Sequence, residues 1–372
     1  MIQIVEANSK KLMREFVKFP FSLYKNHPYW VPPLIADELA GFDAKQNPAF
    51  ETADAFFYIA FKDNEAVGRI AVIINWDEVN KQEKRKVRFG WFDFIDDIAV
   101  SQALLEKVYE IGRKHNLLYA EGPMGFSNLD KVGMITEGYD EIGSMITWYN
   151  YPYYSRHLEK LGYVVEKEYL ENKFPFANVL PEMYEKIEDL VKRRYQLRPM
   201  NFTKTKDIMP YVDQMFDLFN GSYSDLSSFV AINDSQKAYF KKKYISFINP
   251  EYIKFVFDKD DNMIAFSIVM PSFSEALQKA KGKLFPFGLF HLLNARKHSK
   301  KVLFYLIGVT PEYQNKGVTA IVFSEYYKTF KAKGITDCIR TPELSDNHAI
   351  HNIWKNFDPV TFRKRATFRR EL

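Results

Sequence analysis

The same order of predicted helices and strands runs through this chain twice, and this repetition constrains the fold more than any single motif. Apolar runs and alternations predict strands, whereas apolar residues spaced three and four apart predict helices. In the first half the predicted elements cover 3–5, 10–24, 56–61, 67–74, 87–95, 103–115, 117–121 and 153–161. In the second half they cover 195–200, 207–219, 235–247, 252–257, 264–270, 302–307, 318–333, 335–339, 346–357 and, as a pair of strands, 360–372. Two blocks with matching element order indicate an internal duplication.

A chain of 372 residues is long for a single hydrophobic core and has room for two domains. We place the boundary at a short extended stretch bracketed by Pro175 and Pro181. The predicted domains are 1–176 and 177–372, the second with an insertion at 272–301. We expect an α/β (α+β) fold in which each domain is a mixed, mostly antiparallel sheet flanked by helices.

The clearest local pattern is a strand, a polar loop and a helix between residues 302 and 333. The run VLFYLI at 302–307 is typical of a strand covered on both faces. The start of the following helix presents unpaired N–H groups and a partial positive charge, which suit a diphosphate. Gly317 lets the backbone approach phosphate oxygens, and Lys316 adds a cation. We predict that a diphosphate is held by the amides of Lys316, Gly317, Val318, Thr319 and Ala320.

The stretch GVTPEYQNKGVT at 308–319 resembles the acyl-CoA signature of GNAT (Gcn5-related N-acetyltransferase) enzymes. In that family the pattern is Val-x-Pro followed by Gln or Arg, x-x-Gly-x, and Gly or Ala. The matching positions are Val309, Pro311, Gln314 and Gly317. Thr319 departs from the pattern, and its hydroxyl would either bond a phosphate or crowd the site.

The resemblance extends over most of the chain. Stretches similar to a family of bacterial tandem-GNAT proteins are YWVPPL at 29–34, GRIA at 68–71, FGWFD at 89–93, GPM at 122–124, YNYPYY at 149–154 and LFPFGL at 284–289. The resemblance implies acetyl-CoA or a longer acyl-CoA as cofactor, with no metal, and an oxyanion donor on the backbone around 307–309. The implied cofactor-binding residues are Ile307, Gly308, Val309, Gln314, Asn315, Lys316, Gly317, Val318, Thr319, Ala320 and Asn347.

Acyl transfer to an amine also needs a proton for the departing thiolate. The family often uses a tyrosine on the last helix, but Trp354 falls at or next to that position here and cannot act as an acid. Tyr305, Tyr327 and His351 are the alternative catalytic candidates, although packing is the simpler role for Tyr327 and partial exposure for His351. Cys338, the only cysteine, sits in a predicted strand and is expected in the core.

The first copy lacks the phosphate loop and reads Asp96-Asp97-Ile98 where that loop should occur. Two carboxylates suit a helix start but would repel a diphosphate. We therefore expect this copy not to bind CoA and to build part of the acceptor site. The candidate substrate residues are Asp93, Asn128 and Asn150, for which ordinary turn and loop roles are the alternative.

Charge and composition limit the classes of partner that we expect the protein to bind. The balance of 52 Lys and Arg against 47 Asp and Glu gives +5, too small and dispersed for nucleic-acid binding. Basic residues crowd into 279–301 and 363–370, which favours phosphates or a peripheral contact with an anionic membrane. A single cysteine, no signal-peptide pattern and no long apolar run predict a cytoplasmic protein. The sequence does not fix the oligomeric state.

The segment 276–301 combines many leucines and phenylalanines with a basic flank. It is either a lid over a long acyl chain, a contact with a membrane surface, or a helical cover over the core. The function expected is an acyl-CoA-dependent N-acyltransferase with a small-molecule or lipid amine as acceptor. Long-chain acyl transfer to an amino lipid, such as a sphingoid base at the membrane surface, is one alternative. A catalytically silent protein that binds CoA or another nucleotide is the other.

Overall fold

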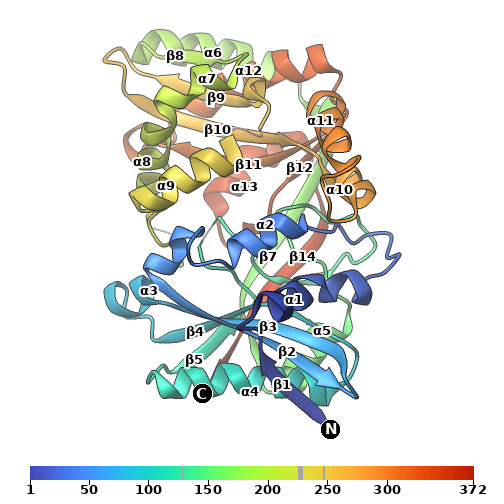
Figure 1. Cartoon of the computed structure of the whole chain (residues 1–372). Coiled ribbons are helices and arrows are strands. Elements are labelled where there is room, and N and C mark those ends of the chain that lie inside the picture. Colours follow the sequence, from blue (N-terminus) through green and yellow to red (C-terminus); the bar gives the residue numbers. More distant parts are fainter. Residues whose placement is uncertain (128, 225–228, 246–247) are drawn as a thin grey trace. The chain divides into compact units, whose positions relative to one another are not determined.

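The computed structural model of the chain describes all residues except 128, 225–228 and 246–247 (Figure 1). The described residues form two compact units. The first unit comprises Met1–Leu170, Ser274–His291 and Phe362–Leu372, and the second comprises Glu171–Phe273 and Leu292–Thr361. Two segments from beyond the predicted boundary at 176 and 177 thus group with the first unit.

The first unit is a sheet with helices on both faces. Its elements are β1 (Ile2–Glu6), α1 (Lys10–Leu23), α2 (Ile35–Gly41), β2 (Ala53–Lys62), β3 (Glu65–Asn75), α3 (Trp76–Lys81), β4 (Lys86–Phe94), α4 (Ile98–Lys114), β5 (Tyr119–Gly122), β6 (Met134–Glu137), α5 (Tyr153–Lys160), the start of β7 (Val164–Pro175), α10 (Ser274–Ala280) and most of β14 (Val360–Glu371). The strand order is β1-β2-β3-β4-β5-β14, and β6 also pairs with β14. Neighbours are antiparallel except for β4 and β5, which are parallel.

Strand β3 shows why this sheet carries two helical layers. Ile70, Val72 and Ile74 pack in one core with the apolar face of α4, whereas Ala71 and Ile73 pack in another with α1. Successive side chains of a strand point to opposite faces, so a strand that is apolar at every position needs cover on both sides.

The second unit repeats the plan. Its elements are the end of β7, α6 (Glu182–Tyr195), β8 (Arg198–Asn201), α7 (Thr205–Ile208), α8 (Val212–Tyr223), α9 (Asp234–Phe240), β9 (Ile253–Phe257), β10 (Met263–Pro271), most of α11 (Gly288–His298), β11 (Lys301–Val309), α12 (Val318–Lys333), β12 (Asp337–Arg340), β13 (Glu343–Leu344) and α13 (His348–Trp354). The sheet runs β8-β9-β10-β11-β12-β7, with β11 and β12 as the parallel pair. The fold class expected from the sequence is confirmed. Cys338 lies in this core, 1% exposed.

Each half of the sequence supplies a strand end to the sheet of the unit formed mainly by the other half. Lys173–Pro175 of β7 pair with β12 in the second unit. Phe368–Glu371 of β14 pair with β5 in the first unit. The prediction of two strands in 360–372 is wrong, because a single strand runs from Val360 to Glu371. That stretch contains no glycine, proline or asparagine that would favour a turn.

If β14 completes the first core, Phe368→Ala should destabilise the first unit by about 3–5 kcal/mol, since the side chain is 1% exposed in the core beside α4. Val360→Ala, on the same strand but 60% exposed, is the matched control and should change stability by less than about 0.5 kcal/mol. Urea unfolding followed by tryptophan fluorescence measures both, because four of the five tryptophans precede residue 170. Equal stabilities would contradict this role of β14.

Candidate functional site

The helix start predicted to bind a diphosphate is α12, and Gly317 is its cap. Gly317 has φ +78° and ψ 13°, in the left-handed region that glycine adopts most easily. No side chain caps the helix. The N–H of Ala320 donates to the carbonyl of Gly317 at 3.0 Å, and that of Lys316 donates to Tyr313 at 3.3 Å. Within the described part of the chain, the N–H groups of Gly317, Val318 and Thr319 have no hydrogen-bond acceptor.

The side chains around this turn add positive charge. The Lys316 ammonium lies 5.3 Å from the ring centre of Tyr195 and 5.0 Å from that of Tyr313. Cation–π attraction of this kind holds the ammonium near the helix start while leaving it exposed. Gln314 is also exposed and donates from Nε2 to the carbonyl of Val309 at 3.2 Å. Asn315 is exposed with φ +61°, and Thr319 is half-buried.

The strand before the turn parts from its parallel neighbour. Pairing between β11 and β12 ends at Phe304 and Arg340. On the other edge, Thr310 donates its N–H to Ile264 of β10 at 2.9 Å. Because backbone groups alternate in direction along a strand, those of Ile307 and Val309 face away from β10. Two N–H groups are thereby directed to the side on which the strands have separated.

Two hydroxyls from the end of α8 reach this part of β11. Tyr223 donates to the carbonyl of Ile307 at 2.9 Å, and Ser222 donates to that of Val309 at 3.1 Å. Burial raises the pKa of Tyr223 to about 12, so its phenol stays protonated at neutral pH. Neither residue was predicted from the sequence. They lie more than 80 residues from their partners, and no local pattern marks such a contact.

The three predicted catalytic residues lie on three different elements, β11, α12 and α13. Tyr305 is the extra residue of a bulge between β10 and β11, next to the last β11–β12 pair. Tyr327 lies ten residues along α12 from Gly317, roughly 15 Å at 1.5 Å per residue. Its ring packs against Phe176 at 5.5 Å, away from the phosphate turn.

His351 belongs to a polar cluster with Arg340 and Glu343. Its Nε2 lies 2.9 Å from the carbonyl of Leu344, and its Nδ1 lies 3.6 Å from Glu343 Oε2. Arg340, at the last β11–β12 pair, forms an ion pair with Glu343. Asn347 caps α13 by accepting from Ile350 at 3.2 Å. Trp354, at the position of the family's tyrosine, is 1% exposed and packs on Phe304 with ring centres 4.8 Å apart.

The corresponding helix start in the first unit is closed by its own side chains. Asp97 caps α4 by accepting from Ala99 at 3.0 Å and pairs with Lys62 at 3.0 Å. Asp96 lies 3.0 Å from His157 Nε2. A carboxylate thus occupies the place that an anion would take, which supports the expectation that this copy does not bind CoA.

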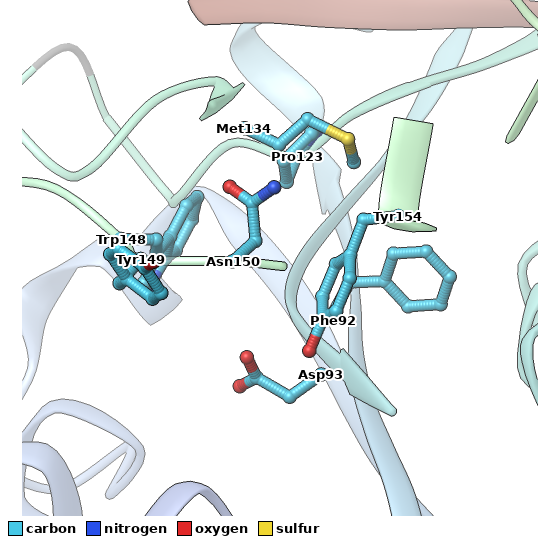
Figure 2. A pocket seen from close by; sticks show the side chains of 8 residues that line it. All are labelled: Phe92, Asp93, Pro123, Met134, Trp148, Tyr149, Asn150 and Tyr154. Atoms are coloured by element: carbon cyan, nitrogen blue, oxygen red, sulfur yellow. The ribbon is translucent and has the colours of Figure 1, made fainter. Parts of the chain in front are cut away.

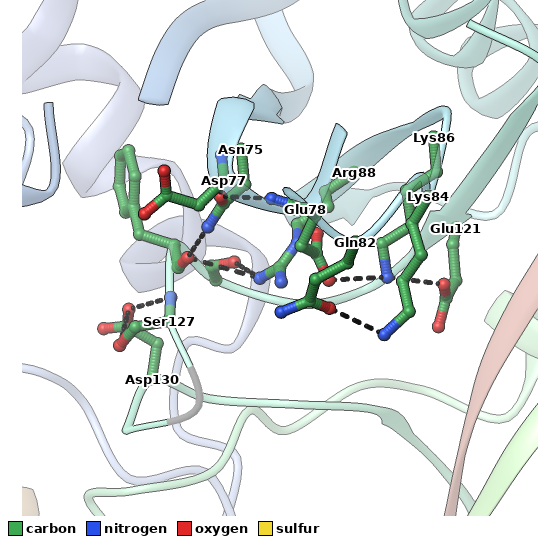
Figure 3. Close-up of polar contacts among 12 residues, drawn as sticks. Asn75, Asp77, Glu78, Gln82, Lys84, Lys86, Arg88, Glu121, Ser127 and Asp130 are labelled. Atoms are coloured by element: carbon green, nitrogen blue, oxygen red, sulfur yellow. Dashed lines mark hydrogen bonds and ion pairs between the residues drawn. The ribbon is translucent and has the colours of Figure 1, made fainter. Parts of the chain in front are cut away.

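The separation of β4 and β5 is also closed. Their pairing ends at Arg88 and Glu121, after which Met124 donates its N–H to Phe89 at 2.8 Å. Arg88 donates to the carbonyl of Gly125 at 2.8 Å. A buried ion network shown in Figure 3 holds this arrangement. Its ion pairs are Arg88–Glu78 at 2.7 Å, Lys86–Glu78 at 3.0 Å and Lys86–Glu121 at 2.9 Å.

The predicted substrate residues Asp93 and Asn150 line one small pocket (Figure 2). Asp93 pairs with Arg69 at 2.7 Å and accepts from the hydroxyl of Tyr24 at 3.0 Å. The Asn150 amide bonds both backbone groups of Ile135, at 2.6 and 3.1 Å. The pocket offers about 10 Å³, room for a single water. Both side chains therefore serve internal contacts here, and Asn128 lies outside the described residues.

The ion network predicts a specific pH dependence. Burial alone would raise the pKa of Glu78, but Arg88 and Lys86 beside it lower that pKa to about 2. A carboxyl with a lowered folded-state pKa stabilises the fold above its unfolded value, near 4.5, and that contribution disappears as the pH falls toward 2. The difference corresponds to about 3 kcal/mol.

Glu78→Gln should therefore lower the stability of the first unit at pH 7 by about 3 kcal/mol or more and flatten the loss of stability between pH 5 and pH 2. Urea unfolding of wild type and variant across this range is the measurement. Glu137→Gln, which removes an exposed pair with Lys364, is the control and should keep the wild-type slope. A Glu78→Gln slope equal to that of wild type would contradict the assignment.

No family model matches the chain. The chain is 26% identical to Protein YghO from Escherichia coli K12, over 84% of this chain and 80% of that protein. It is 23% identical to the bacterial ceramide synthase of Caulobacter vibrioides, over 84% and 82% respectively. Among solved structures, a tandem GNAT protein from the clavulanic acid biosynthesis pathway superposes with TM-score 0.60 and 10% identity, over 100% of this chain and 98% of the other. A GCN5-related N-acetyltransferase from Anabaena variabilis gives TM-score 0.52 and 8% identity, over 100% and 72%. With its duplicated element order and these neighbours, the chain is a tandem GNAT-fold protein.

Proposed function

We propose that the second unit is an acyl-CoA-dependent N-acyltransferase, which moves an acyl group from a CoA thioester to an amine. The observation that carries this proposal is the start of α12, where the N–H groups of Gly317, Val318 and Thr319 find no acceptor among the residues that the structure describes. Buried or half-buried backbone donors are normally paired. Three such donors at the positive end of a helix, beside an exposed lysine, suit a diphosphate.

The residues of the second unit fit the parts of this cofactor. The three amides and Lys316 would hold the diphosphate. The N–H groups of Ile307 and Val309 would face the thioester carbonyl and stabilise the oxyanion that develops there. The cofactor itself supplies the activated acyl group. Tyr223, which orients this strand through Ile307, and Tyr305 at its bulge are the phenols we propose as proton donors to the thiolate.

A second candidate is long-chain acyl transfer to an amino lipid, such as a sphingoid base at the membrane surface. The related ceramide synthase supports it. So do the exposed phenylalanines Phe285, Phe287 and Phe290 before and within α11. Thr319 and the buried Trp354 instead favour a catalytically silent CoA-binding protein. An activity assay distinguishes this hypothesis from both enzyme candidates.

Binding of the cofactor can be tested at the two left-handed glycines that bound α12, Gly317 at its start and Gly334 at its end. Gly317→Asp should weaken acetyl-CoA binding at least tenfold, about 1.4 kcal/mol, because its carboxylate would occupy the anion position and repel the diphosphate. Gly334→Asp carries the same charge and a comparable backbone cost of about 1 kcal/mol. It should bind like wild type in isothermal titration calorimetry. Equal affinities in the two variants would place the cofactor elsewhere.

Acyl preference distinguishes the two acceptor candidates. For the amino-lipid candidate, kcat/KM should rise with acyl length, since each buried methylene contributes up to about 0.8 kcal/mol. Release of free thiol from acyl-CoAs of increasing length, with small amines and sphingoid bases as acceptors, is the measurement. A preference for acetyl-CoA would rule out the lipid candidate. Thiol release with none of the amines, despite CoA binding, would support the silent protein.

A further inference from the structure

The connection between α10 and α11 presents large apolar side chains to solvent. Phe285, Phe287 and Phe290 are 75%, 70% and 68% exposed, and Leu289 is 37% exposed. Leu293, one turn along α11, is 48% exposed. Three phenylalanine rings exposed within six residues are unusual on a protein surface and mark an interaction site. We call residues 279–290 the tip.

The same segment carries the excess positive charge of the chain. Residues 274–301 contain seven lysines and arginines and one glutamate, a net charge of +6, whereas the whole chain carries +5. Lys279, Lys281 and Lys283 are exposed beside the phenylalanines and form no ion pair within the described part of the chain. Helix α11 ends in Arg296, Lys297 and His298. Basic side chains next to exposed rings match an anionic surface with an apolar interior.

The base of the tip is fixed within the first unit. Ser274 Oγ donates to the carbonyl of Gly143 at 2.7 Å, and Gln278 Nε2 donates to that of Pro28 at 2.8 Å. The carbonyl of Gly282 accepts from Ile35 at 3.0 Å. Gly282 has φ +77°, and a Cβ atom there would lie 2.5 Å from the ring of Phe21. The tip is therefore held by a tightly packed base, and its phenylalanines stay exposed rather than folding back onto the protein.

We propose that the tip docks the protein on an anionic phospholipid bilayer, with the phenylalanine rings in the interface and the lysines at the headgroups. Charge selects this partner over a second copy of the chain, because two tips would bring like charges together. None of the helices in the described residues is long and apolar enough to cross a membrane, so the contact is peripheral. The functional role of this docking rests on the proposed acyl transfer to an amino lipid. The docking itself needs no CoA.

Co-sedimentation of the full chain with vesicles tests the proposal. We expect binding to vesicles of phosphatidylcholine with phosphatidylglycerol, at least about tenfold weaker binding to phosphatidylcholine alone, and a decline as salt rises from about 0.1 M to about 0.5 M. Replacing Phe285, Phe287 and Phe290 together by Ser should reduce binding to the anionic vesicles at least about tenfold.

The matched control is Val164→Ser with Val165→Ser, which removes two exposed apolar side chains, 64% and 50% exposed, from β7 of the first unit. It should bind vesicles like wild type. Unchanged vesicle binding by the triple variant, or no binding by wild type, would overturn the proposal. The proposal would also be overturned if wild type formed a dimer, did not bind vesicles, and lost the dimer in the triple variant. Wild type and both variants should bind acetyl-CoA with equal affinity in calorimetry. A failed vesicle assay would then leave the acyltransferase proposal standing. A loss of CoA affinity would likewise not be mistaken for a loss of docking.

Discussion

Backbone groups that leave a sheet need other hydrogen-bond partners, and this requirement distinguishes the two units. In each unit two parallel strands pair for only three or four residues and then separate, at Arg88 and Glu121 in the first and at Phe304 and Arg340 in the second. The first unit satisfies the separated strand with its own chain, through Met124 and the buried ions of Glu78, Lys86 and Arg88. In the second unit the backbone groups of Ile307 and Val309 face the separation, and their carbonyls accept from Tyr223 and Ser222. One fold thus carries a closed and an open version of the same junction.

The starts of α4 and α12 show the same difference between the two units. Asp97 has an extended backbone and caps α4 with its side chain, whereas Gly317, the cap residue of α12, has a left-handed backbone and no side chain. A glycine in place of a capping carboxylate costs a helix only about a few tenths of a kcal/mol. An external anion at α12 would offset that cost.

Periodicity predicted the architecture because each half contains long, strongly patterned elements, such as β3 and α12. It did not predict β7, where Val164 and Val165 are exposed and charged residues interrupt the apolar positions. The turn before α12 was predictable because its backbone contacts are local, within 309–320. The polar contacts of Asp93 and Tyr223 were not, because their partners Arg69 and Ile307 lie 24 and 84 residues away in the sequence. Asp93, a candidate substrate residue for which a structural role was the alternative, pairs with the buried Arg69, which supplies its counterion.

Because each half of the sequence supplies a strand end to the sheet of the other, the two halves depend on each other to complete their sheets. The core beside α4 includes Ala366 and Phe368 of β14. Separating the halves at residue 176 would leave β5 as an open edge and expose that core to water. Contacts between the first 170 residues and the last eleven also span most of the sequence, and such non-local pairing slows folding. The first copy thus has a structural role, because its strand β5 pairs with the last strand of the second copy.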